Sequence, residues 1–465
     1  MNIAIAIIWE GDMRIIIAGD GKVGRILTQK LSMEGHDLTL IDQDQSVLDV
    51  SMERFDVMAV QGNCASMQVL IQAGIRKADL LIAVTGADEI NLLCAMTAHG
   101  INPDVHTIAR IRNPEYNEQI YNMRSLFGLS LIVNPEYQAA REISRLLKYP
   151  GFLKRDTFAK GRVEIVELKV EEGSKLCNMP ICSLNHTFKT KVIVCAVRRD
   201  GQTSIPDGNY ILKQGDRIHV TAATNDLTLL LKNLGIITNK VKRVIICGGG
   251  RISYYLADDL QKSGMHVEII EKDPDRCVEL ANRLPDVDVV KGDGSSQLLL
   301  DSMGVENTDA LVAMTTLDEM NMIISLYGKS CGVKQVVTKV AHLENNSMMD
   351  SLSIGSVICA KELCCNNIVT YVRAMQNKSG AALAIHAIAD GEAEALEFVV
   401  DEKVRNTGVP LKELKFKRNV RIVSIRHMGK GVEFPTGESV MKKGDAVIIV
   451  SGGDNQIRQI NDIFL

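Results

Sequence analysis

The sequence predicts an α/β fold: a tandem repeat of a Rossmann-like domain with a parallel sheet, each copy followed by a small α+β domain. Two observations predict the repeat. The first observation is a glycine-rich loop, Gly19 to Gly24, whose first residue lies 23 residues before Asp42. A second loop, Gly248 to Ser253, begins 23 residues before Glu271. Further landmarks recur at an offset of 229 or 230 residues, among them Gly62/Gly292, Thr85/Thr315, Pro180/Pro410 and Gly215/Gly444. The repeated unit is therefore a whole two-part module.

The third observation is the alternation of short apolar runs with amphipathic segments. In the first copy, apolar runs predict strands at residues 14–18, 38–41, 57–60, 80–84 and 105–110, and amphipathic segments predict helices at 23–34, 66–73 and 89–99. The second copy repeats this pattern from residue 244 to about 358. Continuous apolar strands separated by helices are typical of a parallel sheet that is covered on both faces.

Each of these regions is followed by a segment with a helical apolar stripe, at 134–148 and at 361–373. A stripe beyond a complete sheet needs another surface to cover it, either on its own domain or on a partner domain. The small domains show alternating strands at 162–170, 194–199 and 216–221, and at 395–400, 420–426 and 445–450. A final helix is expected in each, at 226–234 and 455–463.

These patterns divide the chain into seven parts. We expect an N-terminal extension (1–12), a Rossmann-like domain (13–133), a crossover helix with linker (134–155), a small domain (156–236), a second Rossmann-like domain (241–360), a second crossover helix (361–380) and a second small domain (384–465).

Composition excludes several classes of protein. A net charge of −4 gives no basic footprint for a nucleic acid. The longest apolar runs are too short to cross a bilayer, which takes roughly 18 to 20 residues, and the N-terminus does not resemble a secretory signal. The 11 cysteines include no zinc-like C-x-x-C pairs, so we expect reduced thiols in the cores and no metal site. A redox role for Cys364-Cys365 is the minor alternative.

The first glycine loop is expected to bind a nucleotide, because it closes a strand, opens a helix and has an acid at the end of the next strand. Gly19 permits a tight turn, Gly21 lets the backbone approach a pyrophosphate, and Gly24 lets the helix lie close to the sheet. Free N–H groups at the helix start would hold the phosphates. Asp42 would accept hydrogen bonds from both ribose hydroxyls, which favours NAD(H) or an adenosine nucleotide over NADP(H). The predicted contact set of this loop is Gly19, Asp20, Gly21, Lys22, Val23 and Gly24. The alternative is an empty Rossmann-like domain.

The second loop carries the same signal with one departure. Its predicted contact residues are Gly248, Gly250, Arg251, Ile252, Ser253 and Glu271. Serine in place of the third glycine leaves the phosphate cradle possible with altered helix packing. Lys22 and Arg251 are either phosphate contacts or solvated loop charges.

Other candidates lie at the ends of later strands. Gly62-Asn63 and Gly292-Asp293 would meet the adenine or its ribose, or form ordinary turns. Thr85 would cap the helix that follows, with Asp88 reaching back in a capping box, and Thr85 and Thr315 are alternatively neighbours of a nucleotide. Arg110 and Lys339 end the fifth strands, where they would pair with phosphate, meet a partner's ligand, or be surface cations.

The features of an enzyme are missing from the sequence pattern. Hydride transfer needs a proton donor or acceptor beside the nicotinamide. His186, His219, His386 and His427 of the small domains fall at non-equivalent positions, and no G-x-x-x-x-G-K-[ST] loop occurs. The repeated modules are therefore interpreted as sensors rather than catalysts.

The tandem repeat is accompanied by motif segments at 13–24, 40–42, 60–63, 84–91 and 109–116. Together these features resemble the TrkA family, whose members are regulatory subunits of Trk potassium uptake systems. The resemblance runs from Met13 to the end of the chain. It implies two RCK modules, binding of NAD(H) and of ATP or ADP, helix-mediated pairing of modules, and a homo-oligomeric ring, dimer or tetramer, at the cytoplasmic face of the membrane beneath a channel subunit. It makes Gly19 to Gly24 the phosphate loop, Asp42 the ribose acid, Gly62-Asn63 the adenine side and Arg110 a phosphate contact.

Three functions remain open from the sequence. The first is a nucleotide-gated regulatory subunit. The second is an NAD-dependent oxidoreductase, and the third is a nucleotide-binding scaffold without gating. Ser253, Lys339 and Ala341, which replace Gly24, Arg110 and Arg112, leave equal nucleotide preference at the two sites in doubt.

Overall fold

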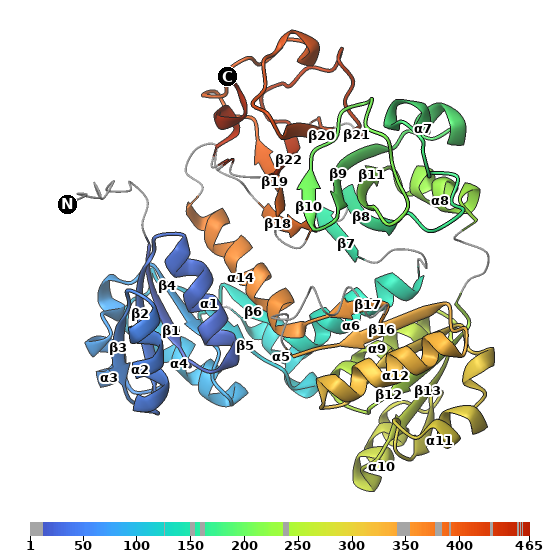
Figure 1. Ribbon diagram of the computed structural model, residues 1–465. Helices are drawn as coiled ribbons and strands as arrows, with labels where there is room; N and C mark the ends of the chain where they lie inside the picture. The colour runs from blue at the N-terminus through green and yellow to red at the C-terminus, as the bar shows by residue number, and fades with distance from the viewer. Residues whose placement is uncertain are drawn as a thin grey trace. The chain divides into compact units, whose positions relative to one another are not determined.

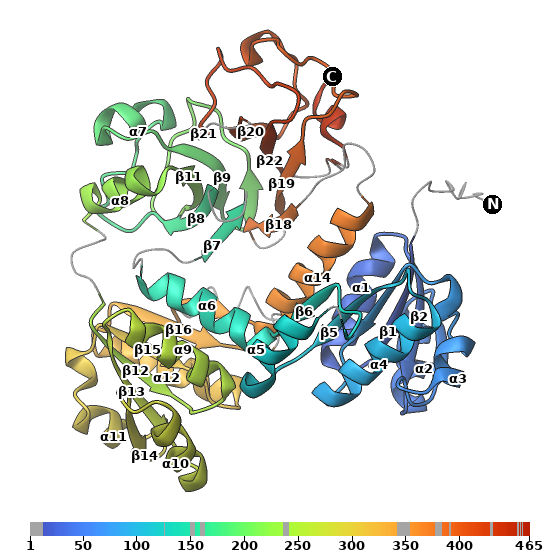
Figure 2. The ribbon, with the colours of Figure 1, turned by 180° about the vertical axis from the view of Figure 1, so that it is seen from behind.

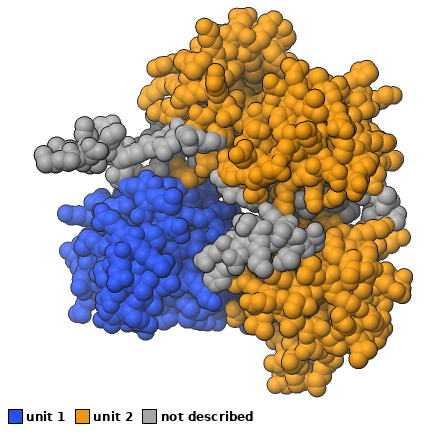
Figure 3. All heavy atoms as spheres, viewed as in Figure 1, with its two compact units in different colours: residues 1–138, 360–372 blue, residues 139–359, 373–465 orange. Residues whose placement is uncertain are grey.

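The computed structural model describes residues 13–124, 126–148, 154–158, 163–235, 241–341, 354–376, 384–389, 392–427, 431–452, 455, 457 and 459–465. The expected extension at residues 1–12 lies outside them. The described residues form two six-stranded and two five-stranded sheets, which confirms the predicted fold class (Figure 1). The chain separates into two compact units, residues 1–138 with 360–372 and residues 139–359 with 373–465 (Figure 3).

The first Rossmann-like sheet is wholly parallel and has the order β3-β2-β1-β4-β5-β6. Strands β1 and β4 at its centre are buried because their side chains are almost all aliphatic. The elements are β1 (Arg14–Ala18), α1 (Lys22–Met33), β2 (Asp37–Asp42), α2 (Gln45–Arg54), β3 (Met58–Gln61), α3 (Met67–Gln72), η1 (Ile75–Lys77), β4 (Leu80–Ala83), α4 (Asp88–Ile101), β5 (His106–Arg110), α5 (Pro114–Met123) and β6 (Leu131–Val133).

The second Rossmann-like sheet repeats this topology with the order β14-β13-β12-β15-β16-β17. Its elements are β12 (Arg243–Cys247), α9 (Arg251–Lys262), β13 (His266–Glu271), α10 (Pro274–Arg283), β14 (Asp288–Lys291), α11 (Gln297–Ser302), η3 (Val305–Asn307), β15 (Ala310–Ala313), α12 (Asp318–Ser330), β16 (Gln335–Lys339) and β17 (Ser356–Ile358). Each strand and helix predicted between residues 14 and 110 is present within a few residues of its expected bounds.

The small domains are antiparallel sheets with the orders β10-β9-β11-β8-β7 and β18-β19-β22-β20-β21. The first contains β7 (Lys154–Phe158), β8 (Val163–Lys169), α7 (Ile181–Phe188), β9 (Ile193–Arg199), β10 (Gln202–Ser204), β11 (Arg217–Ala222) and α8 (Thr224–Asn233). The second contains β18 (Ala384–Ile388), β19 (Ala393–Val399), η5 (Leu411–Glu413), β20 (Val420–Arg426), β21 (Val432–Glu433), β22 (Ala446–Gly452) and η6 (Ile460–Ile463).

The predicted final helix of the second small domain is wrong. The described residues there form only η6, a single 3-10 turn whose Ile460 and Ile463 are buried in the domain core. Unlike the final helix of the first small domain, α8, the segment carries isoleucines every third residue, which suits a tight turn laid on the core. Both small domains belong to one unit and share a buried cluster that includes Val163 and Cys195 of the first and Ala395 and Val450 of the second.

The two crossover helices, α6 (Pro135–Lys148) and α14 (Ala360–Gln376), settle the alternative that the sequence left open (Figures 1 and 2). In the first unit α14 lies on the first Rossmann-like domain: Lys30 of α1 donates to Glu362 at 2.7 Å and to Asn366 at 2.6 Å. In the second unit α6 lies on the second Rossmann-like domain, where Lys148 donates to Asp259 of α9 at 2.7 Å. Each crossover helix is therefore docked on the Rossmann-like domain of the other module.

Candidate functional site

The predicted site residues of the first module come together at the carboxyl edge of the first sheet. Because parallel strands end at the same edge, the strand order places them in the sequence Gly62, Asp42, Gly19, Thr85 and Arg110. The strand order reverses between β1 and β4, and Gly19 lies against the backbone of Thr85 at that point. Ligands of doubly wound sheets bind at such a reversal.

The three glycines of the first loop have different steric surroundings. Gly19 has φ +98°, and a Cβ there would lie 2.9 Å from the Cα of Thr85. A Cβ on Gly24 would lie 2.0 Å from the carbonyl oxygen of Gly19. A Cβ on Gly21 would meet no atom of the described residues within 4 Å. The fold therefore needs glycine at positions 19 and 24, whereas at position 21 the fold leaves open space.

The start of α1 offers backbone N–H donors beside this space. Gly21 caps the helix without a side-chain bond, the first turn holds no acidic residue, and Lys22 is exposed. The first N–H groups of a helix lack partners within it and carry partial positive charge, which together attract an anion. Val23, by contrast, points into the core and is buried. The expected contact from Val23 is therefore limited to its backbone.

Asp42 is held at the end of β2 by backbone donors. Its Oδ2 accepts from the N–H of Asp20 at 2.8 Å, and its Oδ1 accepts from the N–H of Asp44 at 3.0 Å. The side chain stays partly exposed. The carboxylate is thus fixed in orientation beside the loop, with acceptor capacity left for hydroxyl groups.

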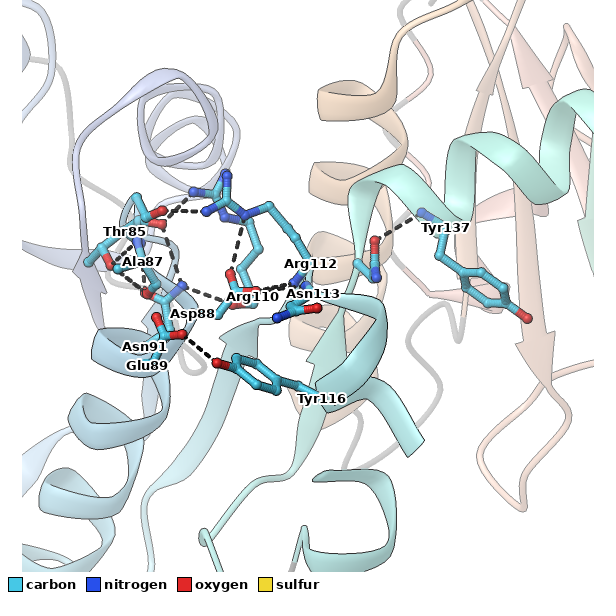
Figure 4. A network of polar contacts seen from close by, with 12 residues as sticks. Thr85, Ala87, Asp88, Glu89, Asn91, Arg110, Arg112, Asn113, Tyr116 and Tyr137 are labelled. Carbon is cyan, nitrogen blue, oxygen red and sulfur yellow. Dashed lines mark hydrogen bonds and ion pairs between the residues drawn. The ribbon is translucent and has the colours of Figure 1, made fainter. Parts of the chain in front are cut away.

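The capping box expected at Thr85 and Asp88 is wrong. Helix α4 begins at Asp88, and its N-cap is Ala87 without a side-chain bond. The Thr85 hydroxyl instead donates to Oδ1 of Asn91 at 2.7 Å, and Asp88 accepts from the N–H of Arg112 at 2.7 Å and of Asn113 at 2.8 Å (Figure 4). Asp88 is drawn to the next loop because the chain after β5 supplies unpaired N–H donors there. This network braces the ends of β4 and β5.

Arg110 enters the same network. Its guanidinium donates to the carbonyl oxygen of Thr85, and Asn91 donates to the carbonyl oxygen of Arg110 at 2.8 Å (Figure 4). Burial, helped by the neighbouring Arg112, lowers the pKa of Arg110. Its Nε is buried and has no hydrogen-bond partner among the described residues. Arg110 is therefore a half-buried cation at the carboxyl edge, with a buried Nε that has no acceptor among the described residues.

Asn63 behaves as a turn residue in this structure. Its side chain is exposed, and its Oδ1 accepts from the N–H of Ala65 at 3.0 Å. Asp293, its counterpart, accepts from the N–H of Ser295 at 3.0 Å and pairs with Lys272 at 3.3 Å. The hydroxyl of Ser295 also donates to Asp293, at 2.6 Å, and this bond, followed by the backbone one, holds the pKa of Asp293 below its usual value. Gly62 and Gly292 close the third strand of each sheet by donating to the backbone of Asp42 and Glu271.

The second site keeps the geometry of the first with different side chains. A Cβ on Gly248 would lie 2.7 Å from the carbonyl oxygen of Met314, whereas a Cβ on Gly250 would have no neighbour within 4 Å in the described part of the chain. Ser253 is buried, and its hydroxyl donates to the carbonyl oxygen of Gly248, so the serine fits where a glycine was expected. Arg251 is exposed and Ile252 half-buried.

Glu271 and Lys339 take the places of Asp42 and Arg110. Glu271 accepts from the N–H of Gly249 at 2.6 Å and from the N–H groups of Lys272 and Asp273 at 2.7 and 2.8 Å. Lys339 donates to the carbonyl oxygen of Thr315 at 2.6 Å, as Arg110 does to Thr85. Arg276, which the sequence pattern did not single out, donates to the carbonyl oxygen of Gly249 at 2.7 Å. Its place in the first helical turn after an N-cap Asp was the signal that could have found it.

Fold and site together define a two-module protein in which each module joins a Rossmann-like domain, with a glycine loop at its carboxyl edge, to a small β-rich domain. The TrkA-N domain model matches residues 15–135 and 244–360, and the TrkA-C domain model matches residues 165–235 and 395–465. The chain belongs to the TrkA family.

Relatives match over nearly their whole length. A Trk system potassium uptake protein TrkA homolog of Archaeoglobus fulgidus is 32% identical over 97% of this chain and 100% of its own length. The Trk system potassium uptake protein TrkA of Haemophilus influenzae is 29% identical over 97% and 98%. Among solved structures, the GsuK RCK domain superposes with a TM-score of 0.62 at 17% identity, covering 96% of this chain and 93% of that one. The GsuK channel bound to NAD gives a TM-score of 0.60 at 16% identity, covering 96% and 78%. Among the described residues, no helix is both long and apolar enough to cross a membrane.

Proposed function

We propose that this protein is a regulatory subunit of a Trk-type potassium uptake system, in which each module binds a nucleotide and the bound state biases the opening of a membrane subunit. The relatives that match over nearly their full length are named as Trk system potassium uptake proteins. The observation that carries the nucleotide proposal is the open space at Gly21 and Gly250. Glycine at these two positions serves a ligand that approaches the backbone, since the fold alone has room for a side chain.

The chemistry of the first site favours NAD(H), with ADP or ATP as alternatives. The start of α1 supplies donors for phosphate, and Asp42 supplies an oriented acceptor for ribose hydroxyls. A phosphate on the 2′ oxygen would be repelled by Asp42. A solved structure of the same fold is described as bound to NAD and another as bound to ADP. Arg110 would meet a terminal phosphate or a ligand from a neighbouring module, a role that its buried Nε, without a partner among the described residues, supports.

Regulation would follow from linkage. A ligand shifts a gate only if it binds two conformations of the assembly with different affinity. The crossover helices couple the modules, because α14 is docked on the first Rossmann-like domain and α6 on the second. We propose that nucleotide binding moves the Rossmann-like domains about these helices, at residues 135–150 and 361–377, and so changes the conformation of a ring at the cytoplasmic face of the membrane.

A ring requires contacts between chains, and the Rossmann-like domains have a repeated apolar surface for them. Helix α4 exposes Leu93 and Met96, and helix α12 exposes Ile323 and Leu326 at the matching positions. Exposed apolar side chains that recur at the same places in both modules favour an interface with further copies of this chain. Leu93→Glu with Met96→Glu is expected to give smaller particles in light scattering. Met58→Glu on the edge strand β3 is the control, and particles of unchanged size in the double variant would refute this surface.

Calorimetric titration tests the nucleotide proposal. NADH, ADP and ATP are titrated into the wild type, Asp42→Ala, Glu271→Ala and the control Asp49→Ala, which removes an exposed acid of α2. Each site variant is expected to lose one binding event, by about tenfold or more for two lost hydroxyl contacts, and the control is expected to lose none. Undiminished binding in both site variants would refute the assignment. Potassium flux through the membrane subunit that is insensitive to the protein and its nucleotides would refute the regulatory role.

A further inference from the structure

Asp20, the second residue of the first loop, has a buried side chain that the proposed ligand does not explain. The residue is completely buried. The Ser51 hydroxyl of α2 donates to its Oδ2 at 2.5 Å. Its Oδ1 is buried and has no hydrogen-bond partner among the described residues. A buried carboxylate oxygen without a donor disfavours the charged form.

The charges around Asp20 act in both directions. Burial raises the pKa of the Asp20 carboxyl, the hydrogen bond from Ser51 and the guanidinium of Arg25 on α1 lower it, and the carboxylate of Asp42 on β2 raises it again. The net direction is upward. Asp20 thus stands one residue from Gly21, where phosphate would approach, as a carboxyl that gains a proton more readily than an ordinary aspartate.

The second module lacks this group, and two positions change together. Gly249 replaces Asp20, and a Cβ there would lie 2.6 Å from Cδ1 of Leu280 and 2.9 Å from Oε2 of Glu271. Leu280 stands where Ser51 stands in the first module, 229 residues earlier. The polar pair of the first site is therefore replaced by a glycine and an apolar side chain. In addition, Arg276 donates to the carbonyl oxygen of Gly249.

We propose that Asp20 is a specificity-determining residue of the first nucleotide site: its buried carboxyl limits how much phosphate charge the site accepts, and uptake of a proton by Asp20 relaxes that limit. The second site, with Gly249, has no such control. This inference rests on the proposed nucleotide function. It makes the first module a site whose ligand choice depends on pH, and the second a site whose choice does not.

The direction follows from electrostatics. A bound phosphate raises the proton affinity of a neighbouring carboxyl, so binding takes up a proton while Asp20 is ionised in the free protein. Affinity at the first site therefore rises as the pH falls through the raised pKa of Asp20. ATP, which carries more negative charge than NAD⁺, is the more strongly affected ligand.

The test compares NAD⁺ and ATP binding to the full chain and to Asp20→Asn. At about pH 8, Asp20→Asn is expected to bind NAD⁺ at least about tenfold more tightly than the wild type, because repulsion between unit charges a few ångströms apart at an effective dielectric of about 20 exceeds a tenfold effect. The gain in ATP affinity is expected to be larger. Calorimetry in two buffers with different ionisation enthalpies counts the protons. NAD⁺ is the cleaner probe, because its pyrophosphate stays ionised. The wild type is expected to take up protons at one site and Asp20→Asn at neither.

The inference would be overturned if Asp20→Asn took up as many protons on binding as the wild type does and kept the wild-type ratio of ATP to NAD⁺ affinity. Should Asp20→Asn fail to fold, Ser51→Ala tests the same idea with Asp20 in place. It removes a hydrogen bond that favours the carboxylate, so the proton uptake is expected to persist to higher pH, and an unshifted profile would overturn the inference. Failure of NAD⁺ and ATP to bind the wild type at any pH would instead refute the proposed nucleotide function.

Discussion

The loop glycines make a paired prediction that separates the needs of the fold from those of the ligand. In Gly24→Ala the new Cβ would lie 2.0 Å from the carbonyl oxygen of Gly19, where ordinary van der Waals contact begins at 3.4 Å. The obstacle is backbone, so no side-chain rotation relieves it. In Gly21→Ala the new Cβ would lie more than 4 Å from every atom that the structure describes outside its own neighbours in the chain, and φ is −72°, which alanine adopts freely.

The magnitudes follow from these distances. Overpacking against fixed atoms costs about 1–3 kcal/mol, and alanine returns up to about 1 kcal/mol of helix propensity near the start of α1. Gly24→Ala should therefore lose about 1–2 kcal/mol, which lowers the melting temperature of the first Rossmann-like domain by about 3–10 °C. Gly21→Ala should stay within about 0.5 kcal/mol of the wild type. It should nevertheless lose about tenfold or more in nucleotide affinity, because its methyl group occupies the space that the phosphates need.

Thermal unfolding and calorimetric titration of the two variants measure both effects. Gly24→Ser is the informative intermediate, since Ser253 occupies the equivalent place and its hydroxyl bonds to the carbonyl oxygen of Gly248. A hydrogen bond of this kind recovers about 0.5–1.5 kcal/mol, so the serine variant should melt above the alanine variant. A Gly24→Ala protein with wild-type melting, or a Gly21→Ala protein with wild-type nucleotide affinity, would refute the reasoning.

Two further predictions concern regions away from the loop. Lys30→Glu places two acids together and should loosen α14, which faster amide hydrogen exchange in α14 would show. Adding Glu362→Lys to the same chain should restore slow exchange. If the second change does not restore it, the ion pair does not hold the helix. Hydrogen bonding to Glu433 raises the pKa of His427, which also contacts Asp445. The stability that protonated His427 contributes is therefore fully present below about pH 6.5, and it is lost as the pH rises through the raised pKa. Chemical unfolding of His427→Gln against pH should lack that decline, and an equal decline would exclude His427 as its source.

The nucleotide loop could be predicted from the sequence because its demands are local. Gly19 is required because its φ is positive, and Gly24 is required because the start of the helix touches the backbone of Gly19. An acid at the end of the next strand completes the pattern at a fixed spacing. The repeat then transferred the prediction to the second module. The strands could also be predicted from the sequence, because buried parallel strands such as β1 and β4 are continuous aliphatic runs.

Other features depend on contacts that sequence spacing does not contain. Helix α2 was not predicted because it buries only Leu48 and Ser51, too few to produce a periodic signal. The spacing of Thr85 and Asp88 matched a capping box, yet the helix begins at Asp88 and the carboxylate serves the loop after β5. The apolar stripes predicted the crossover helices. They did not predict which surface each helix packs against, because any apolar surface can bury such a stripe.

Ion pairs contribute to the contact with that surface. Lys30 of α1 and Asp259 of α9 occupy equivalent positions, 229 residues apart, and carry opposite charges. Their partners are reversed to match: Glu362 of α14 meets Lys30, whereas Lys148 of α6 meets Asp259. Glu362 is the third residue of α14 and Lys148 the last residue of α6, so the two ion pairs lie at different places along the crossover helices. Each crossover helix is docked on the Rossmann-like domain of the other module, and each of these contacts includes a pair of opposite charges. A pairing of unlike modules always joins a site containing Asp20 to one containing Gly249, so every coupled pair would combine a proton-dependent nucleotide site with a proton-independent one.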